Sequence, residues 1–227
     1  MKETNIFKEI EKNLQQLEKP SEFLNKLKDS QEFKESSFKV LGDLVNTPQE
    51  LKYHPEGNVW NHLCMVVDAA SVAKLLSYNK REFIWSALLH DLGKLTTTIK
   101  RNGRWTSYNH DTEGYNMVKG LLIKETGDEK FAEKVAELVK FHMHHIYILK
   151  NLPFGNIKEL LETNNINDIL LLFACDKLGR GGQTSEDKKR MFKEVLRILD
   201  ILEKKSGIKY NDARENIISF KEKIVNE

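Results

Sequence analysis

The histidines of this chain are concentrated in one region and accompany carboxylates. All seven lie between residues 54 and 145, at positions 54, 62, 90, 110, 142, 144 and 145. In the stretch WSALLHDLGK, residues 85–94, an apolar run ends in His90 and Asp91. A buried imidazole or carboxylate costs free energy unless it has a partner. The stretch therefore predicts convergent polar side chains, which are typical of a metal site or of a buried hydrogen-bond network.

Three expected helices each direct a metal-competent residue inward. His62 shares a helix face with Val66 and Ala73, His90 and Asp91 end the next helix, and Asp176 lies one turn after Leu172 in an apolar helix. His62, His90, Asp91 and Asp176 are therefore candidate metal ligands, with a buried hydrogen-bond network as the alternative. Nitrogen and oxygen donors without thiolate suit a hard or borderline divalent ion, but they do not choose among Mn, Fe, Co, Ni and Mg.

A second metal is a further possibility in the same pocket. His110 follows an expected hairpin, and His142 lies on the inner face of another helix. His145, three residues later, shares that face, whereas His144 points elsewhere if the helix continues. These three histidines either complete a second site that shares Asp91, or, in the case of His110 and His142, contact the substrate.

Composition excludes several classes of protein. The 227 residues carry 36 basic and 34 acidic side chains, so no global field points to nucleic acid or to a membrane. The start, MKETNIFKEIEKNL, is charged and amphipathic rather than a signal peptide, and no apolar run of membrane-spanning length is evident. Cys64 and Cys175 lie in apolar helical patterns, as buried reduced thiols do. We expect a soluble, cytoplasmic protein without a membrane partner.

The elements that position these residues are mostly helices. Apolar residues at i, i+3 and i+4 predict the following helices: 59–76, 81–92 closing on Gly93, Asp111 to about Gly127, one capped by Asp128, one from Asn167 or Asp168 through Asp176, a long helix after the loop 179–187, and one from about Asp212. Residues 96–108 flank Asn102-Gly103 with β-branched and aromatic residues, which predicts a hairpin.

The predicted fold class is therefore all-α, a helical bundle with one small β-hairpin insertion. We expect a single domain over residues 1–227, with N-terminal helices in 1–50 packed on a core of 51–200 and a C-terminal helix in 201–227.

The order His62, His90-Asp91 and Asp176 resembles the HD-domain metal-dependent phosphohydrolase superfamily. Over about residues 38–200 the resemblance is closer, to the HD domain of bacterial multifunctional CCA-adding enzymes and their free-standing relatives. It rests on five landmarks in order: HPEGNVWNHLCMVVDAA, ALLHDLGKLTTT, NGRWTSYNHDTEG, LVKFHMHH and ACDKLGRGG.

This resemblance implies a helical HD domain that hydrolyses phosphate esters with a metal-activated water. The implied activities are those of a 2′,3′-cyclic phosphodiesterase, a 2′-nucleotidase or a phosphatase, acting on nucleotides or RNA ends. One departure is that this chain reads Asn109-His110-Asp111 where the branch usually has Gly-His-Glu. No nucleotidyltransferase segment is recognised, so CCA addition by this chain is not expected.

Two cations are candidate catalytic and substrate-binding residues alongside Asp91. Lys94 lies one turn beyond His90, and it either contacts phosphate or stabilises a helix C-terminus. Arg180 follows Asp176 by four residues and is expected to bind phosphate, with a structural ion pair as the alternative. Trp105 and Tyr108 either stack on a base or only pack the hairpin.

The alternative function is a non-catalytic RNA- or protein-binding module with a structural metal. The oligomeric state and the roles of His54 and His144 are not predicted by the sequence.

Overall fold

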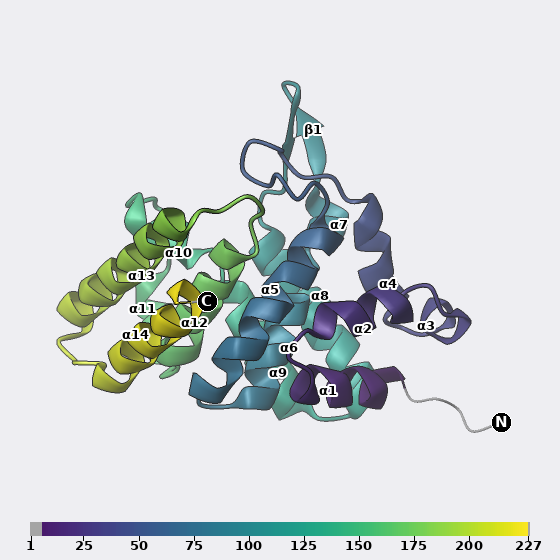
Figure 1. Cartoon of the computed structure of the whole chain (residues 1–227), viewed down its shortest axis with the longest axis horizontal. Helices are drawn as coiled ribbons and strands as arrows, with labels where there is room; N and C mark the ends of the chain where they lie inside the picture. Colours follow the sequence, from purple (N-terminus) through teal and green to yellow (C-terminus); the bar gives the residue numbers. More distant parts are fainter. Residues whose placement is uncertain (1–5, 227) are drawn as a thin grey trace.

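Helices form nearly all of the regular structure, as the sequence predicts. A computed structural model describes residues 6–226 (Figure 1). The N-terminal elements are α1 (Ile6–Gln16), α2 (Pro20–Leu27), α3 (Gln31–Glu35), α4 (Lys39–Gly42) and the 3-10 turn η1 (Asp43–Asn46). The central elements are α5 (Val59–Ala73), η2 (Lys74–Leu76), α6 (Lys80–Leu89), α7 (Lys94–Thr97), β1 (Ile99–Arg101), β2 (Arg104–Thr106), α8 (His110–Thr126), α9 (Glu129–Phe141), α10 (His144–Leu149), α11 (Ile157–Glu162) and α12 (Ile166–Leu178). The chain continues into α13 (Ser185–Ser206) and α14 (Asn211–Val225).

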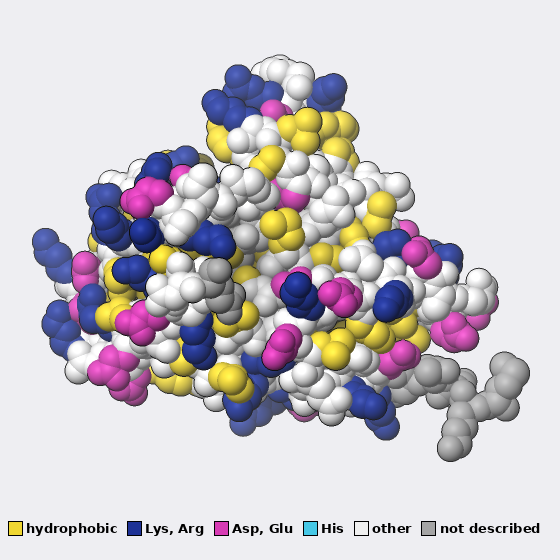
Figure 2. Space-filling model, viewed as in Figure 1, with side chains coloured by type: hydrophobic (Ala, Val, Ile, Leu, Met, Phe, Trp, Pro, Cys, Tyr) yellow, Lys and Arg dark blue, Asp and Glu magenta, His cyan; other side chains and the backbone are white. Residues whose placement is uncertain are grey.

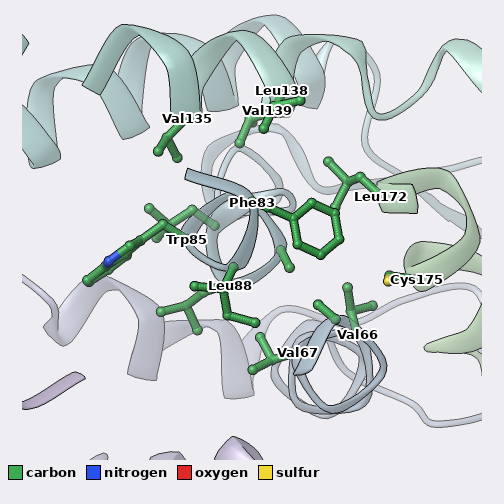
Figure 3. Packing of buried hydrophobic residues seen from close by; sticks show 14 of the residues in the cluster. Val66, Val67, Phe83, Trp85, Leu88, Val135, Leu138, Val139, Leu172 and Cys175 are labelled. Atoms are coloured by element: carbon green, nitrogen blue, oxygen red, sulfur yellow. The ribbon is translucent and has the colours of Figure 1, made fainter. Parts of the chain in front are cut away.

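Helix α6 lies at the centre of the apolar core. It contacts α5, α9 and α12, and its side chains are buried on every side of the helix (Figure 3). The labelled residues around it come from all three neighbours: Val66 and Val67 from α5, Val135, Leu138 and Val139 from α9, and Leu172 and Cys175 from α12. A helix that is apolar all round can be stable only in such a setting. The end of α6, with His90 and Asp91, is consequently inside the molecule.

The terminal helices extend this core. Phe7 of α1 stacks on Trp85 of α6, with ring centroids 4.8 Å apart. Helix α2 contacts α5, and α14 contacts both α12 and α13. Packing is thus continuous across residue 50, and α13 itself spans residue 200. The predicted division at residues 50 and 200 stays a prediction.

The predicted hairpin is confirmed. Strands β1 and β2 pair antiparallel, with Ile99 opposite Thr106 and Arg101 opposite Arg104. Asn102 and Gly103 form the turn with φ angles of 48° and 77°, which these two residue types tolerate better than others.

One stretch of the chain, Val59–Leu76, is long and apolar enough to cross a membrane, with a mean hydropathy of 1.2 over 18 residues. Within the fold 67% of that stretch is buried, as part of the core. Because the core helix of a soluble protein has the same length and composition, this stretch is weak evidence for a membrane span.

Several predicted helix ends differ from the structure. Helix α6 ends at Leu89, and Gly93 has right-handed helical geometry rather than that of a left-handed cap. Helix α8 begins at His110 after the left-handed Asn109, so Asp111 is not its cap. The cap of α12 is Asn165, whose side chain accepts from the Asp168 amide. Only the cap at Asp128 is confirmed, because its carboxylate accepts from the Phe131 amide. Neighbouring polar residues compete for cap positions, and sequence alone does not rank them.

Gly93 is required by a close approach of two chain segments. A Cβ atom at this position would lie 2.1 Å from the His110 carbonyl oxygen and 2.5 Å from the Gly114 amide nitrogen. These contacts are to backbone, which cannot rotate away. The absence of a side chain at Gly93 therefore allows the turn after His90 and Asp91 to pack directly against the start of α8.

We predict that Gly93→Ala destabilises the fold by about 3 kcal/mol, because the added methyl forces these backbones apart. The measurement is the free energy of unfolding in urea. Gly120→Ala, on the open side of the same α8 helix, is the matched control. It should stabilise by up to about 1 kcal/mol, since alanine favours the helix. Equal effects of the two changes would contradict the prediction.

Candidate metal centre

Four side chains, from helices α5 and α12 and from the turn after α6, meet in what we call the first ligand set. His62 Nε2 lies 3.0 Å from Asp176 Oδ1 and 3.3 Å from His90 Nε2. Asp91 Oδ2 lies 3.6 Å from His62 Nε2 and 3.4 Å from His90 Nε2. Donor atoms that each stand about 2.1 Å from one ion are separated by about 3.0–3.5 Å. The spacing of the set therefore suits a single divalent ion.

The other oxygen of Asp91 faces a second ligand set. Asp91 Oδ1 lies 3.4 Å from His110 Nε2 and 3.6 Å from His142 Nε2. The two imidazole nitrogens are 3.1 Å apart. His110 opens α8 and His142 directly follows α9, and these two helices pack along each other. Asp91 consequently stands between the two sets and presents one oxygen to each.

Backbone carbonyls orient the imidazoles. Nδ1 of His90, His110 and His142 lies 2.9, 2.6 and 2.5 Å, respectively, from the carbonyl oxygen three residues earlier. A carbonyl only accepts, so each Nδ1 carries the proton and donates it. The Nε2 atoms are then left with a lone pair that points into the pocket, which is the tautomer a metal requires.

This arrangement fits a cation. Without one, the lone pairs of His110 Nε2 and His142 Nε2 oppose each other at 3.1 Å, and those of His62 Nε2 and His90 Nε2 at 3.3 Å. Two buried acceptors at such distances repel unless a proton or a metal ion lies between them. The six side chains of the two sets, with no thiolate among them, suit a divalent ion in each set.

The pKa values of Asp91 and Asp176 are lowered, which is also consistent with a cation site. Burial alone would raise the pKa of Asp91, but the charges of Lys94 and His90 hold it well below its usual value. Burial likewise opposes ionisation of Asp176, yet the hydrogen bond from His62 keeps its pKa well below the usual value. Both residues are therefore carboxylates at neutral pH and attract cations.

The pKa values of the imidazoles depend on burial and on the carboxylates they face. Burial disfavours charge on His62, but hydrogen bonds with Asp176 and Glu56 outweigh it and raise its pKa to about 9. Burial, together with the neighbouring charge of His142, lowers the pKa of His110 to about 3. The pKa of His142 is raised in spite of burial, because it faces Asp91. Of the two imidazoles in the second ligand set, His142 therefore binds a proton more readily than His110.

A carboxylate outside the pocket supports His62. Glu56 Oε1 lies 3.1 Å from His62 Nδ1 and 2.7 Å from His54 Nδ1, while Glu56 Oε2 accepts from the Gly181 amide at 3.0 Å. The Gly179 carbonyl lies 3.1 Å from the same His62 nitrogen. A carboxylate behind a ligating histidine fixes its ring and increases its basicity. The sequence indicates Glu56 only by its proximity to His62.

Two cations border the pocket. The Lys94 ammonium lies 2.7 Å from Asp91 Oδ2, without hydrogen-bond alignment, and it donates to Gln49 Oε1 at 2.8 Å. Arg180 follows the end of α12, and its charge lowers the pKa of Asp176. The Arg180 Nε atom is buried and has no hydrogen-bond partner among the described residues. Helix α12 ends at Leu178, so Arg180 reaches the pocket from the loop rather than from a continuing helix.

The remaining candidates lie at the edge of the site. His145 Nε2 is 3.7 Å from Asp176 Oδ2, beside the first ligand set rather than with His110 and His142. His144 packs between Phe141 and Tyr147, outside both sets. The chain turns between α9 and α10, so a single helix does not relate these histidines.

Asn109 and Asp111, where the sequence departs from the Gly-His-Glu pattern, lie on either side of His110. Asn109 has a φ of 61°, a conformation that glycine adopts freely and that asparagine tolerates. The Asp111 carboxylate is bonded to the Thr112 amide and the Tyr147 hydroxyl. The departure therefore preserves the backbone geometry that places His110.

Comparison with known proteins adds a family and a set of relatives. A sequence model described as the HD domain matches residues 59–205. The multifunctional CCA protein of Hahella chejuensis is 29% identical over 74% of this chain and 39% of its own length. That of Verminephrobacter eiseniae is 32% identical over 61% of this chain and 34% of its length, and that of Pseudomonas fluorescens is 26% identical over 80% and 44%. This chain thus spans about two fifths of the length of the curated relatives it matches.

We predict that His110→Ala loses the ion of the second ligand set and keeps that of the first, because only Asp91 is common to both. Asp91→Ala should lose both ions. The measurement is elemental analysis per folded chain after loading with Mn²⁺ or Ni²⁺. His144→Phe, a buried histidine outside the sets, is the control and should keep the wild-type content. Unchanged metal content in His110→Ala would mean that His110 serves the substrate instead.

The raised pKa of His62 predicts how metal affinity varies with pH. Below about pH 9 the metal-free His62 carries a proton that a metal ion must displace. The apparent affinity for Mn²⁺ should therefore rise about tenfold per pH unit between pH 7 and 8.5 through this group. Titration calorimetry at pH 7 in buffers of different ionisation enthalpy should show release of at least one proton. An affinity that is independent of pH in this range would contradict the expectation.

Proposed function

Because this chain belongs to the HD domain family, and so to the metal-dependent phosphohydrolase superfamily, we propose that it hydrolyses phosphate esters of nucleotides or RNA ends. The substrates are phosphate mono- or diesters, and the reaction is of the 2′,3′-cyclic phosphodiesterase, 2′-nucleotidase or phosphatase type. The curated relatives reported above share the name multifunctional CCA protein. Together with the resemblance to CCA-adding enzymes, this name supports a substrate from RNA.

One observation supports this proposal more than any other: Asp91 lies between two ligand sets and presents a separate oxygen to each. A structural metal needs only one closed set of ligands. Paired sets that share a carboxylate are the arrangement used to hold the attacking and leaving oxygens in phosphoryl chemistry. A divalent ion in such a set supplies a Lewis acid that neutralises phosphate charge and lowers the pKa of water.

The chain's own residues contribute binding and orientation. His62, His90, Asp91 and Asp176 would hold a first ion, and His110 and His142 with Asp91 would hold a second. Lys94 is a fixed ammonium at the same pocket, because Gln49 and Asp91 anchor it. The guanidinium of Arg180 has an unused buried N–H donor, which is available to a phosphate oxygen.

The test is hydrolysis of bis(p-nitrophenyl) phosphate and of 2′,3′-cyclic AMP by the purified chain. We expect turnover with Mn²⁺, Co²⁺ or Ni²⁺, and its loss in chelator with recovery when metal is restored. Asp91→Asn should abolish turnover because it removes the charge shared by both ligand sets. A metal-loaded, folded chain that hydrolyses neither ester would contradict the proposal and favour a non-catalytic binding module with a structural metal.

Arg180 provides a sharper form of the same test. We predict that Arg180→Ala keeps its metal content and lowers kcat/KM about 10- to 100-fold, the effect of losing a charge-assisted hydrogen bond to the phosphate. Arg190→Ala, an exposed arginine on α13 that pairs with Asp187, is the matched control and should leave kcat/KM unchanged. Loss of metal in Arg180→Ala would instead show that the residue stabilises Asp176.

A further inference from the structure

The β-hairpin and the loop beside it project from the body of the molecule as one arm. We define this hairpin arm by six residues: Lys52, Tyr53, Arg101, Arg104, Trp105 and Tyr108. In Figure 1 the hairpin and the loop before α5 rise together at the top, and in Figure 2 the same place gathers basic and apolar side chains. The amide of Trp105 donates to Glu50 Oε2 at 3.3 Å, which joins the hairpin to the loop. Two segments far apart in sequence thus form one surface.

The arm exposes aromatic rings that a folding role does not explain. Tyr53 is 56% exposed, Tyr108 is 65% exposed and Trp105 is 36% exposed. A hairpin that packed only for stability would bury at least one face of such rings. The two tyrosines are instead more than half exposed, and Trp105, although mostly covered, keeps about a third of its surface accessible to a partner.

Positive charge accompanies every one of these rings. Arg101 Cζ lies 4.8 Å from the Tyr108 ring centroid, and Lys52 Nζ lies 5.6 Å from that of Tyr53. Lys100 Nζ is 5.7 Å from the Trp105 ring. Residues 98–109 contain three basic side chains and no acidic one, whereas the whole chain is nearly neutral. The arm is therefore a local basic patch interleaved with aromatic rings.

The base of the arm is built into the metal centre. The Ser107 carbonyl accepts from His110 Nδ1 at 2.6 Å, so the end of the hairpin sets the orientation of a predicted ligand. Gln49, at the start of the loop, holds Lys94. A chain molecule lying along the arm would accordingly arrive at the pocket with its end.

We propose that the hairpin arm binds the single-stranded segment next to an RNA end whose phosphate is hydrolysed at the metal centre. This inference rests on the proposed function and names the substrate class: an oligonucleotide rather than a free nucleotide. Exposed aromatic rings stack on bases without regard to sequence, and lysine and arginine side chains bind the phosphates between them. Single-stranded nucleic acid requires both features side by side, and the arm provides both.

The length of the arm makes the choice of an oligonucleotide specific. Arg101 and Arg104 form the pair next to the turn, two residues beyond the pair of Ile99 with Thr106. They stand about 7 Å farther from the body than that pair, given the rise of a strand. We infer that the nucleotides next to the terminal one, rather than the terminal nucleotide itself, meet these two arginines.

An anionic membrane surface is the other partner that exposed aromatic and basic residues can bind. The position of the arm favours RNA, because its base orients His110 and holds Lys94 at a pocket suited to a phosphate ester. Each ring also has a cation beside it, which keeps the apolar surface from forming one continuous patch for lipid. The two partners are separated by the binding experiment below.

The first experiment compares two substrates that share one reaction. We expect kcat/KM to be at least tenfold higher for an eight-nucleotide single-stranded RNA ending in a 2′,3′-cyclic phosphate than for 2′,3′-cyclic AMP. In Arg101→Gln/Arg104→Gln and in Trp105→Ala this ratio should fall at least fivefold. Lys204→Gln/Lys205→Gln, which removes two exposed lysines at the far end of α13, is the matched control and should keep the ratio. A ratio that the arm variants leave unchanged would overturn the proposal.

The second experiment measures binding without turnover, so that it does not depend on catalysis. A fluorescein-labelled twelve-nucleotide RNA is titrated with the full chain in chelator, and the dissociation constant should rise at least fivefold in either arm variant. For Arg101→Gln/Arg104→Gln the slope of log affinity against log salt should become shallower by about 1.4, from two lost phosphate contacts. Arm-dependent binding without hydrolysis of any ester would sink the proposed function and leave the arm proposal standing. Hydrolysis of an ester without arm-dependent RNA binding would overturn the arm proposal and leave the proposed function standing. Arm-dependent binding to phosphatidylserine vesicles, without binding to RNA, would also overturn the arm proposal.

Discussion

The buried carboxylate of Asp91 is the group on which the rest of the site depends. Its two oxygens face different ligand sets, and Lys94 and His90 hold its pKa well below the usual value. A charge in this position is costly unless cations surround it. Imidazoles and an ammonium group offset part of that cost, and divalent ions would offset more in the function we propose. The convergence of helices α5, α6, α8, α9 and α12 on one point can be understood as the arrangement that brings these partners to Asp91.

Hydrogen bonds to the backbone fix the orientation of most side chains in this polar pocket. Three imidazoles donate to backbone carbonyls three residues earlier in the chain, and His62 is held by Glu56 and the Gly179 carbonyl. The carbonyl acceptors are themselves held in place, because the apolar packing around α6 fixes the helices, and the imidazole rings are therefore held in fixed orientations. Gly93 has the complementary role, since its missing side chain lets His90 and Asp91 approach the start of α8. Rigid helices and one close backbone contact together set the distances between ligand atoms.

The irregular parts of the chain determine what reaches the pocket. The loop before α5 supplies Gln49 and Glu56, the hairpin leads into His110, and the loop after α12 carries Arg180. Each of these segments touches a residue of the ligand sets or the cation beside them. Variation in such segments can change the substrate while the helices keep the metal ligands in place. The hairpin arm is the clearest case, because it is basic and aromatic where the chain as a whole is nearly neutral.

The sequence by itself determined the helical fold, the hairpin at Asn102-Gly103, and the order of His62, His90-Asp91 and Asp176, because these follow from local periodicity, turn chemistry and a family pattern. It did not determine helix ends, since Asn165 and Asp168 are equally good caps by residue type. Nor did it place His145 beside Asp176, or reveal Glu56 behind His62 and Gln49 beside Lys94. These contacts join residues from separate segments, and their distances are set by how whole helices pack. The sequence left a second site that shares Asp91 and a contact with the substrate as alternatives, and only the tertiary structure placed one Asp91 oxygen toward each ligand set.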